Sequence, residues 1–288
     1  MIDLQSDKCE PRRQFTITTA DERGLHCRTW ADDQCKYVLI VVHGLGEHSG
    51  CYDEFGSVMC ERGIGVYAFD LHGHGKSPGV RGHAPSLDTL VDDIEAVCNY
   101  VSEQHNRDDS GVQVSILGHS MGGHLVLRYV LDQDRCNVAR AIVTNPMILP
   151  DNPPTKAQSF AAWLTSKVIP RVRMSADIDP SDLTQDEDVL VKLGRDPLMH
   201  EQLSIGIGGE LMSSGHQMVE NANELSIPLL VLRGGDDDLC DVETTDAFCD
   251  AAGTLCDSHT FDGLRHSLLL EKEREQVFDS IQQWLLKK

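Results

Sequence analysis

Gly118-His119-Ser120-Met121-Gly122 is the stretch that decides the fold. The residues before it, 112–117, are rich in β-branched side chains and predict a strand, whereas the apolar residues 124–130 after it predict a helix. A Gly-x-Ser-x-Gly sequence between a strand and a helix is typical of a nucleophile elbow, a turn so sharp that only small flanking residues fit. We therefore expect the Ser120 hydroxyl to stand clear of the backbone. The Met121 amide, at the start of the helix, would then face a developing oxyanion.

Strands and helices alternate along most of the chain on both sides of this turn. The continuous apolar run 37–42 is typical of a central strand buried on both faces. Periodicity predicts further strands at 12–20, 24–31, 65–70, 139–144, 228–234 and 258–261, and helices at 52–62, 86–104, 158–169 and 271–287, with the elbow helix ending near 131. This alternation implies an α/β fold in which helices cover both faces of a mostly parallel sheet.

The alternation stops at Pro146 and resumes only near residue 228. Residues 150–221 contain no segment that predicts a buried strand, and several prolines interrupt them. We expect this part to be a helical insertion that lies over one end of the sheet as a cap or lid. The sequence thus predicts a core formed by residues 1–149 and 222–288 and a lid formed by residues 150–221.

Composition excludes several classes of partner. The formal net charge is −21, from 25 Lys and Arg against 46 Asp and Glu. Phosphates would be repelled, so we expect no nucleic-acid partner and no purely electrostatic attachment to anionic lipid.

The longest apolar run, 38–42, is far too short for a membrane span, and the N-terminus lacks a signal-peptide pattern. The ten cysteines contain no Cys-x-x-Cys pair, and we expect them to be free thiols in the cytoplasm.

A serine nucleophile needs a base within hydrogen-bond reach and an acid that orients this base. After residue 228 the chain contains two histidines. His259 falls within a predicted strand, where we expect a partly buried structural role. His266 falls in the following loop, where the active-site residues of open α/β sheets gather, and is the expected base. The acid should follow the strand 229–233, and four residues qualify on position alone: Asp236, Asp237, Asp238 and Asp241.

The second oxyanion donor should come from a loop after an earlier strand. His43-Gly44-Leu45-Gly46 fits, because glycine lets the backbone approach a substrate closely and the Leu45 amide could pair with that of Met121. No carboxylate or cysteine lies at ligand spacing from His43 and His48 or from the histidines of 72–75, so we expect no metal site.

Four segments together resemble the monoacylglycerol lipase family of α/β-hydrolases: 43–52 (HGLGEHSGCY), 70–77 (DLHGHGKS), 118–123 (GHSMGG) and 234–241 (GGDDDLCD). The resemblance spans residues 12–288 and is weakest in the lid. In the family's acid loop the catalytic aspartate lies three residues before a cysteine, and this register selects Asp237. The resemblance implies a serine hydrolase that cleaves monoacylglycerols to glycerol and fatty acid without a cofactor. A lysophospholipase or a general carboxylesterase is the alternative.

Leu45 and Arg265 depart from the family pattern, and the roles of Cys240 and of residues 160–164 stay open. Leu45 replaces a smaller residue, which should be harmless because only its amide is needed. Arg265 precedes the base where an aromatic or small residue is expected, which would alter the pocket rim. Cys240 should lie near the site, either as a functional thiol or as an inert buried one. Residues 160–164 (FAAWL) would either form an exposed apolar patch or pack on the core. We expect at least transient membrane contact through this patch.

Overall fold

The computed structural model describes residues 11–32, 35–105, 111–151 and 155–287. The strands in this part of the chain are β1 (Arg13–Thr18), β2 (Gly24–Thr29), β3 (Tyr37–Val42), β4 (Ile64–Phe69), β5 (Gln113–His119), β6 (Arg140–Thr144), β7 (Arg173–Ser175), β8 (Gln202–Ser204), β9 (Leu229–Gly234) and β10 (Cys256–Phe261). The α-helices are α1 (Asp53–Glu61), α2 (Leu87–His105), α3 (Met121–Leu131), α4 (Lys156–Ser166), α5 (Pro180–Leu183), α6 (Glu187–Arg195), α7 (Ile205–Glu220), α8 (Val242–Ala252) and α9 (Arg274–Leu286).

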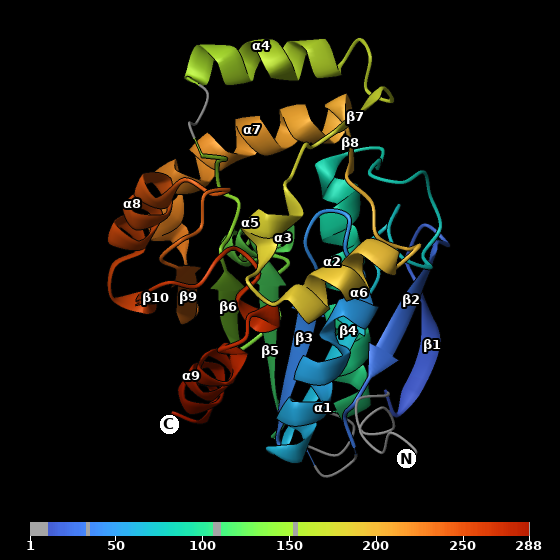
Figure 1. Cartoon of the computed structure of the whole chain (residues 1–288), viewed down its shortest axis with the longest axis vertical. Helices are drawn as coiled ribbons and strands as arrows, with labels where there is room; N and C mark the ends of the chain where they lie inside the picture. The colour runs from blue at the N-terminus through green and yellow to red at the C-terminus, as the bar shows by residue number, and fades with distance from the viewer. Residues whose placement is uncertain (1–10, 33–34, 106–110, 152–154, 288) are drawn as a thin grey trace.

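Eight of these strands form one sheet in the order β1-β2-β4-β3-β5-β6-β9-β10. Strand β2 runs antiparallel to both of its neighbours, and every other neighbouring pair is parallel. The predicted fold class, a mostly parallel sheet between helices, is therefore confirmed (Figure 1).

The central strands are buried on both faces, which explains their continuous apolar sequences. In β3, Val38, Ile40 and Val42 face a hydrophobic core that is completed by α2, α3, α7 and α8. Leu39 and Val41 point the other way, into a second core completed by α1 and α9. The two cores hold the sheet rigid, so the loops at the carboxyl ends of its strands have fixed starting points.

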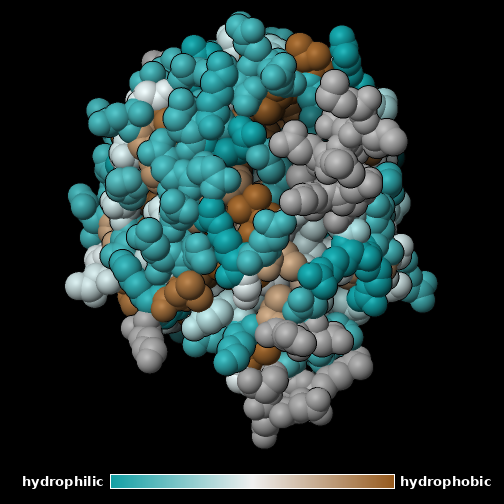
Figure 2. Space-filling model, turned by 60° about the horizontal axis from the view of Figure 1, so that its bottom comes forward, coloured by the Kyte–Doolittle hydropathy of each residue, from teal (hydrophilic) through white to brown (hydrophobic). Residues whose placement is uncertain are grey.

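The segment between β6 and β9 forms a cap at one end of the sheet (Figure 1). Helix α4 lies outermost and packs on α7, which in turn packs on α3 and α8. Besides the helices α4 to α7, this segment contains a short antiparallel ribbon of β7 and β8, which the sequence analysis does not predict. The opposite end of the molecule is mainly hydrophilic, with hydrophobic residues in small separate patches (Figure 2).

Helix α8 was not predicted, although Asp241 supplies a regular N-cap by accepting from the Thr244 N–H at 2.7 Å. His259 lies in β10 as expected but is exposed rather than partly buried, because β10 is the edge strand. All nine described cysteines are free thiols, whereas Cys9 lies outside the described residues. None of the helices in the described ranges is long and apolar enough to span a membrane.

Candidate active site

Ser120 lies on a strained turn between β5 and α3. Its backbone adopts φ 52° and ψ −119°, a conformation that non-glycine residues rarely occupy. A Cβ atom at Gly118 would lie 2.4 Å from the Gly122 oxygen, and one at Gly122 would lie 2.3 Å from the Val42 oxygen. Side chains at either glycine would therefore force the turn apart. This geometry matches the sharp strand-to-helix turn that the local sequence predicts.

His266 reaches Ser120 from the loop that follows β10. Its Nε2 atom lies 2.8 Å from Ser120 Oγ. The loop is held from the sheet side by Asn145, whose side-chain N–H donates to the carbonyl oxygens of Arg265 and His266. Asn145 Oδ1 accepts from the Gly234 N–H at 2.9 Å, so one side chain joins the ends of β6 and β9 to the loop of the imidazole. No motif or periodicity in the sequence marks Asn145, whose φ of 42° lies in the left-handed region.

Asp237 lies on the far side of the His266 ring from Ser120. Its two carboxylate oxygens lie 3.0 and 3.1 Å from His266 Nδ1, and both side chains are buried. The other three aspartates have different positions: Asp236 and Asp238 are exposed, and Asp241 caps α8. Of the four aspartates that position alone allowed, Asp237 is thus the one in contact with the imidazole.

Cys240 lies close to both Asp237 and His266. Its sulfur lies 3.9 Å from His266 Nδ1 and 3.5 Å from the Asn145 carbonyl oxygen. Burial raises the pKa of the Cys240 thiol well above its usual value, and Asp237 adds to the effect. Within the described ranges, Asp237, Cys240 and His266 form the one group of three side chains with metal-ligand spacing. However, the imidazole is already hydrogen-bonded at both nitrogens, and a protonated thiol is a poor ligand, so the group fits a hydrogen-bonded network better than a metal.

Leu45 and Met121, the two expected oxyanion donors, lie beside Ser120. Met121 is the first residue of α3, and Leu45 lines the same cavity as Ser120 and His266. Within the described part of the chain, neither backbone N–H donates to a protein acceptor. Both amides are therefore left without a partner in the fold among these residues.

Glu47, which is not among the predicted site residues, holds the loop that carries Leu45. Its Oε2 atom accepts from the Gly44 N–H at 2.9 Å and from the Tyr52 hydroxyl at 2.7 Å. Burial alone would raise the pKa of Glu47, but His119 and these two hydrogen bonds lower it. Burial lowers the pKa of His119 itself to about 4, although the Glu47 carboxylate opposes this shift.

The cavity above Ser120 has a volume of about 300 Å³ and lies between the sheet loops and the cap. Its cap side is mainly apolar and is lined by Ile178, Pro180, Leu183, Leu190, Leu193 and Met199. Its sheet side is polar and includes Glu47, His119 and the Ser120–His266 pair. A ligand with one apolar and one polar part would match this division.

Comparison with known proteins identifies the family. The sequence profile of the family described as serine aminopeptidase, S33, matches residues 33–273. The chain belongs to this family. It is 31% identical over 273 residues to a putative monoglyceride lipase of Schizosaccharomyces pombe, covering 91% of this chain and 71% of that protein. It is 30% identical over 272 residues to an uncharacterized abhydrolase domain-containing protein of Dictyostelium discoideum, of whose length it covers only 28%.

Solved structures give the same result. A monoacylglycerol lipase of Paleococcus ferrophilus is 26% identical, with a TM-score of 0.79 and coverage of 91% of this chain and 98% of that one. The resemblance to monoacylglycerol lipases that four sequence segments predict is thus confirmed, and the chain is a serine hydrolase with the α/β-hydrolase fold.

Proposed function

We propose that this protein hydrolyses monoacylglycerols to free fatty acid and glycerol through an acyl-enzyme intermediate. The observation that carries the proposal is the continuous hydrogen-bonded relay from Asp237 through His266 to Ser120, at the floor of a cavity with an apolar cap side. The names of the Schizosaccharomyces and Paleococcus relatives support the same substrate.

In the proposed reaction Ser120 Oγ attacks the ester carbonyl carbon while His266 Nε2 takes the hydroxyl proton. Asp237 accepts from His266 Nδ1–H, which fixes the tautomer and stabilises the imidazolium. His266 then returns the proton to the departing glycerol oxygen. Water repeats the sequence on the acyl-enzyme, so the steps consume only ester and water. No metal or cofactor takes part.

The oxyanion that forms at each tetrahedral stage would be bound by the backbone N–H groups of Leu45 and Met121. Support for this role comes from their position beside Ser120 and from the lack of another acceptor among the described residues. Loss of one such donor typically costs about 3 kcal/mol of transition-state stabilisation. The acyl chain would lie against the apolar cap residues and the glycerol group against the polar side.

Ser120→Ala provides the direct test. We expect kcat to fall by about 10⁴-fold or more for both a monoacylglycerol and a p-nitrophenyl ester. A variant that cleaves either ester near the wild-type rate would contradict the assignment. Substrate class is tested on the wild type with matched monoacylglycerols, lysophospholipids and aminoacyl anilides. We expect the highest kcat/KM for monoacylglycerol; preference for lysophospholipid or anilide would reassign the enzyme as a lysophospholipase or an aminopeptidase.

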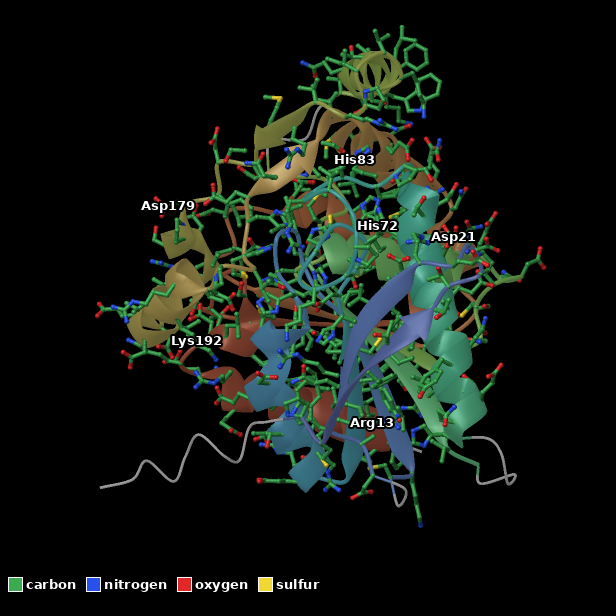
Figure 3. All side chains as sticks on the ribbon, turned by 90° about the vertical axis from the view of Figure 1, so that its right-hand side faces the viewer. Arg13, Asp21, His72, His83, Asp179 and Lys192 are labelled. Carbon is green, nitrogen blue, oxygen red and sulfur yellow. The ribbon has the colours of Figure 1, made fainter. Side chains whose placement is uncertain are left out.

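We further propose that the core and lid divide as the sequence predicts and that α4 contacts lipid membranes. Phe160 and Leu164 on α4 are 62% and 54% exposed, and Val168, just beyond it, is 77% exposed. Helix α4 stands at the outer limit of the cap, where such a patch could reach a bilayer (Figure 3). Residues 155–175 carry four basic side chains and no acidic one, in a protein of charge −21.

A vesicle sedimentation assay tests membrane contact. Each large side chain withdrawn from water contributes about 2 kcal/mol, so the double variant Phe160→Ser/Leu164→Ser should bind phosphatidylcholine vesicles at least about tenfold more weakly. Val242→Ser, which removes an exposed side chain from α8, is the control and should not change binding. Equal binding of all three proteins would rule out this contact. We also propose a cytoplasmic location, supported by the free thiols and testable by cell fractionation.

A further inference from the structure

The cap is bonded directly to the loop that carries His266. Cap residues 181–185 run alongside residues 263–271, which we name the base loop. The backbone N–H of His266 donates to the Asp182 carbonyl oxygen at 3.3 Å, and that of Ser267 to the Leu183 oxygen at 2.7 Å. The guanidinium of Arg265 donates to the Ser181 carbonyl oxygen as well. The peptide of the proposed base is therefore held by the cap on one side and by Asn145 on the other.

Glu271 lies at the centre of this contact and is fully buried, with 0% of its surface exposed. Its Oε1 atom accepts from the Arg265 N–H at 2.7 Å, one residue before His266. Its Oε2 atom accepts from the Thr184 hydroxyl and from the Gln185 N–H, both at 2.8 Å. One carboxylate thus joins the base loop to the turn between α5 and α6.

These contacts do not belong to the relay itself. Glu271 is hydrogen-bonded to neither Ser120 nor Asp237 nor the His266 ring, and among the described residues it forms no ion pair through its carboxylate. A buried carboxylate without a cation is costly unless each oxygen is satisfied by good donors. Here three donors come from two segments that are about 80 residues apart in the sequence. If either segment shifted, Glu271 would lose a donor and remain buried.

We infer that Glu271 is a positioning residue that sets the place of the His266 imidazole and couples it to the cap. This inference rests on the proposed roles of Ser120 and His266. A bound substrate would contact this link directly. Leu183 lines the apolar side of the cavity, and its carbonyl oxygen accepts from the Ser267 N–H of the base loop. The segment α5–α6 runs down the side of the molecule, with Asp179 and Lys192 on its outer edge (Figure 3). The segment α5–α6 therefore helps to position His266 and also covers the pocket.

Glu271→Gln tests the inference because it keeps the size of the side chain. An amide has one acceptor oxygen, so its NH₂ group must face a donor either at Arg265 or at Thr184 and Gln185. The base loop should then shift, and misplacement of a reacting group by about 1 Å can cost about 10²-fold in rate. For folded protein we expect kcat on p-nitrophenyl acetate, and the rate constant for fluorophosphonate labelling of Ser120, to fall about 10- to 100-fold. KM for this short ester should stay within about twofold, because Glu271 does not line the cavity.

Glu273→Gln is the matched control, since Glu273 is exposed and its side chain makes no capping bond. It should behave as wild type. A merely structural role of Glu271 would lower the melting temperature but leave kcat and the labelling rate of the folded fraction unchanged, which would overturn the inference. If the wild type itself is not labelled at Ser120, the proposed function fails and the inference fails with it.

A second pair of variants keeps the test decisive if Glu271→Gln does not fold. Thr184→Val removes the hydroxyl that donates to Glu271 while preserving shape, and Thr184→Ser restores the donor. We expect Thr184→Val to slow Ser120 labelling severalfold and Thr184→Ser to bring the rate back toward wild type. Equal labelling rates for wild type and both variants would refute the coupling.

Discussion

Gly46 is the position where a single methyl group should force the cap apart from residues 43–46, which carry the proposed oxyanion donor Leu45 and which we name the oxyanion loop. Its backbone has φ +73°, and a Cβ atom there would lie 1.6 Å from the His200 carbonyl oxygen, which is cap backbone. The same two residues are joined by a hydrogen bond of 3.1 Å from the His200 N–H to the Gly46 oxygen. In Gly46→Ala the two backbones must therefore move apart by more than an ångström.

The expected cost has two parts. The left-handed conformation costs a non-glycine residue about 1–2 kcal/mol, and loss of the His200–Gly46 hydrogen bond adds about 1 kcal/mol, so the free energy of unfolding should fall by about 2–3 kcal/mol. Leu45 precedes Gly46 and would move with it. Withdrawal of one oxyanion donor lowers kcat by about 10²- to 10³-fold.

Gly63→Ala is the matched control. Gly63 has φ +82°, and nothing lies within 4 Å of a Cβ atom built there. This variant should lose only the conformational part, about 1–2 kcal/mol, and should keep its activity. Urea unfolding gives the free energies, and hydrolysis of a p-nitrophenyl ester gives kcat. If Gly46→Ala keeps wild-type kcat and is no less stable than Gly63→Ala, the clash does not act on the oxyanion loop and our reasoning is wrong.

Two further predictions address the acid of the relay and a buried carboxylate elsewhere. Asp237→Asn should lower kcat by about 10⁴-fold because the asparagine favours the wrong His266 tautomer, whereas exposed Asp236→Asn should not; similar kcat values for both would contradict the relay. Burial raises the pKa of Asp93 to about 6 although its contacts with Arg23 and the His72 N–H oppose this. The native state therefore binds a proton more readily than the unfolded chain, and the free energy of unfolding should fall as pH rises from about 4 to about 6. Urea unfolding across this range checks the effect, which Asp93→Asn should abolish.

The parts of the molecule that could be predicted are those with a local cause. The elbow at Ser120 follows from two glycines whose Cβ atoms would collide with backbone, and the β3 strand follows from burial on both faces. The position of the base loop could be predicted because the active-site loops of open α/β sheets follow the carboxyl ends of the strands. Asp237, by contrast, could not be separated from Asp241 by spacing, because both lie in the same loop and one of them caps a helix.

The parts that sequence reasoning missed depend on contacts between distant segments. Asn145 and Glu271 each satisfy backbone groups from other elements, and no periodicity or motif marks such a residue. The exposure of His259 depends on β10 being the edge strand, which is a property of strand order and not of the strand's own residues. In the β7–β8 ribbon each strand has only three residues, and the two strands are separated in sequence by α5 and α6. Strands this short leave no periodicity from which they could be predicted.

The distribution of hydrogen bonds divides the cap into two parts with different attachments. The part from α5 to residue 200 is bonded to both loops that flank Ser120: Ser267 N–H donates to the Leu183 oxygen, and His200 N–H donates to the Gly46 oxygen. His48 Nε2 adds a contact of 3.0 Å with Asp196 on the oxyanion side. Helix α4, by contrast, packs on α7, away from both loops. Substitutions in the first part should therefore act on the rate of the chemical step, because they displace the proposed base, His266, or the proposed oxyanion donors. Substitutions on the outer face of α4 should act on encounter with a lipid substrate and leave kcat on a short water-soluble ester unchanged. A loss of short-ester kcat caused by Phe160→Ser would show that the two parts are not separate.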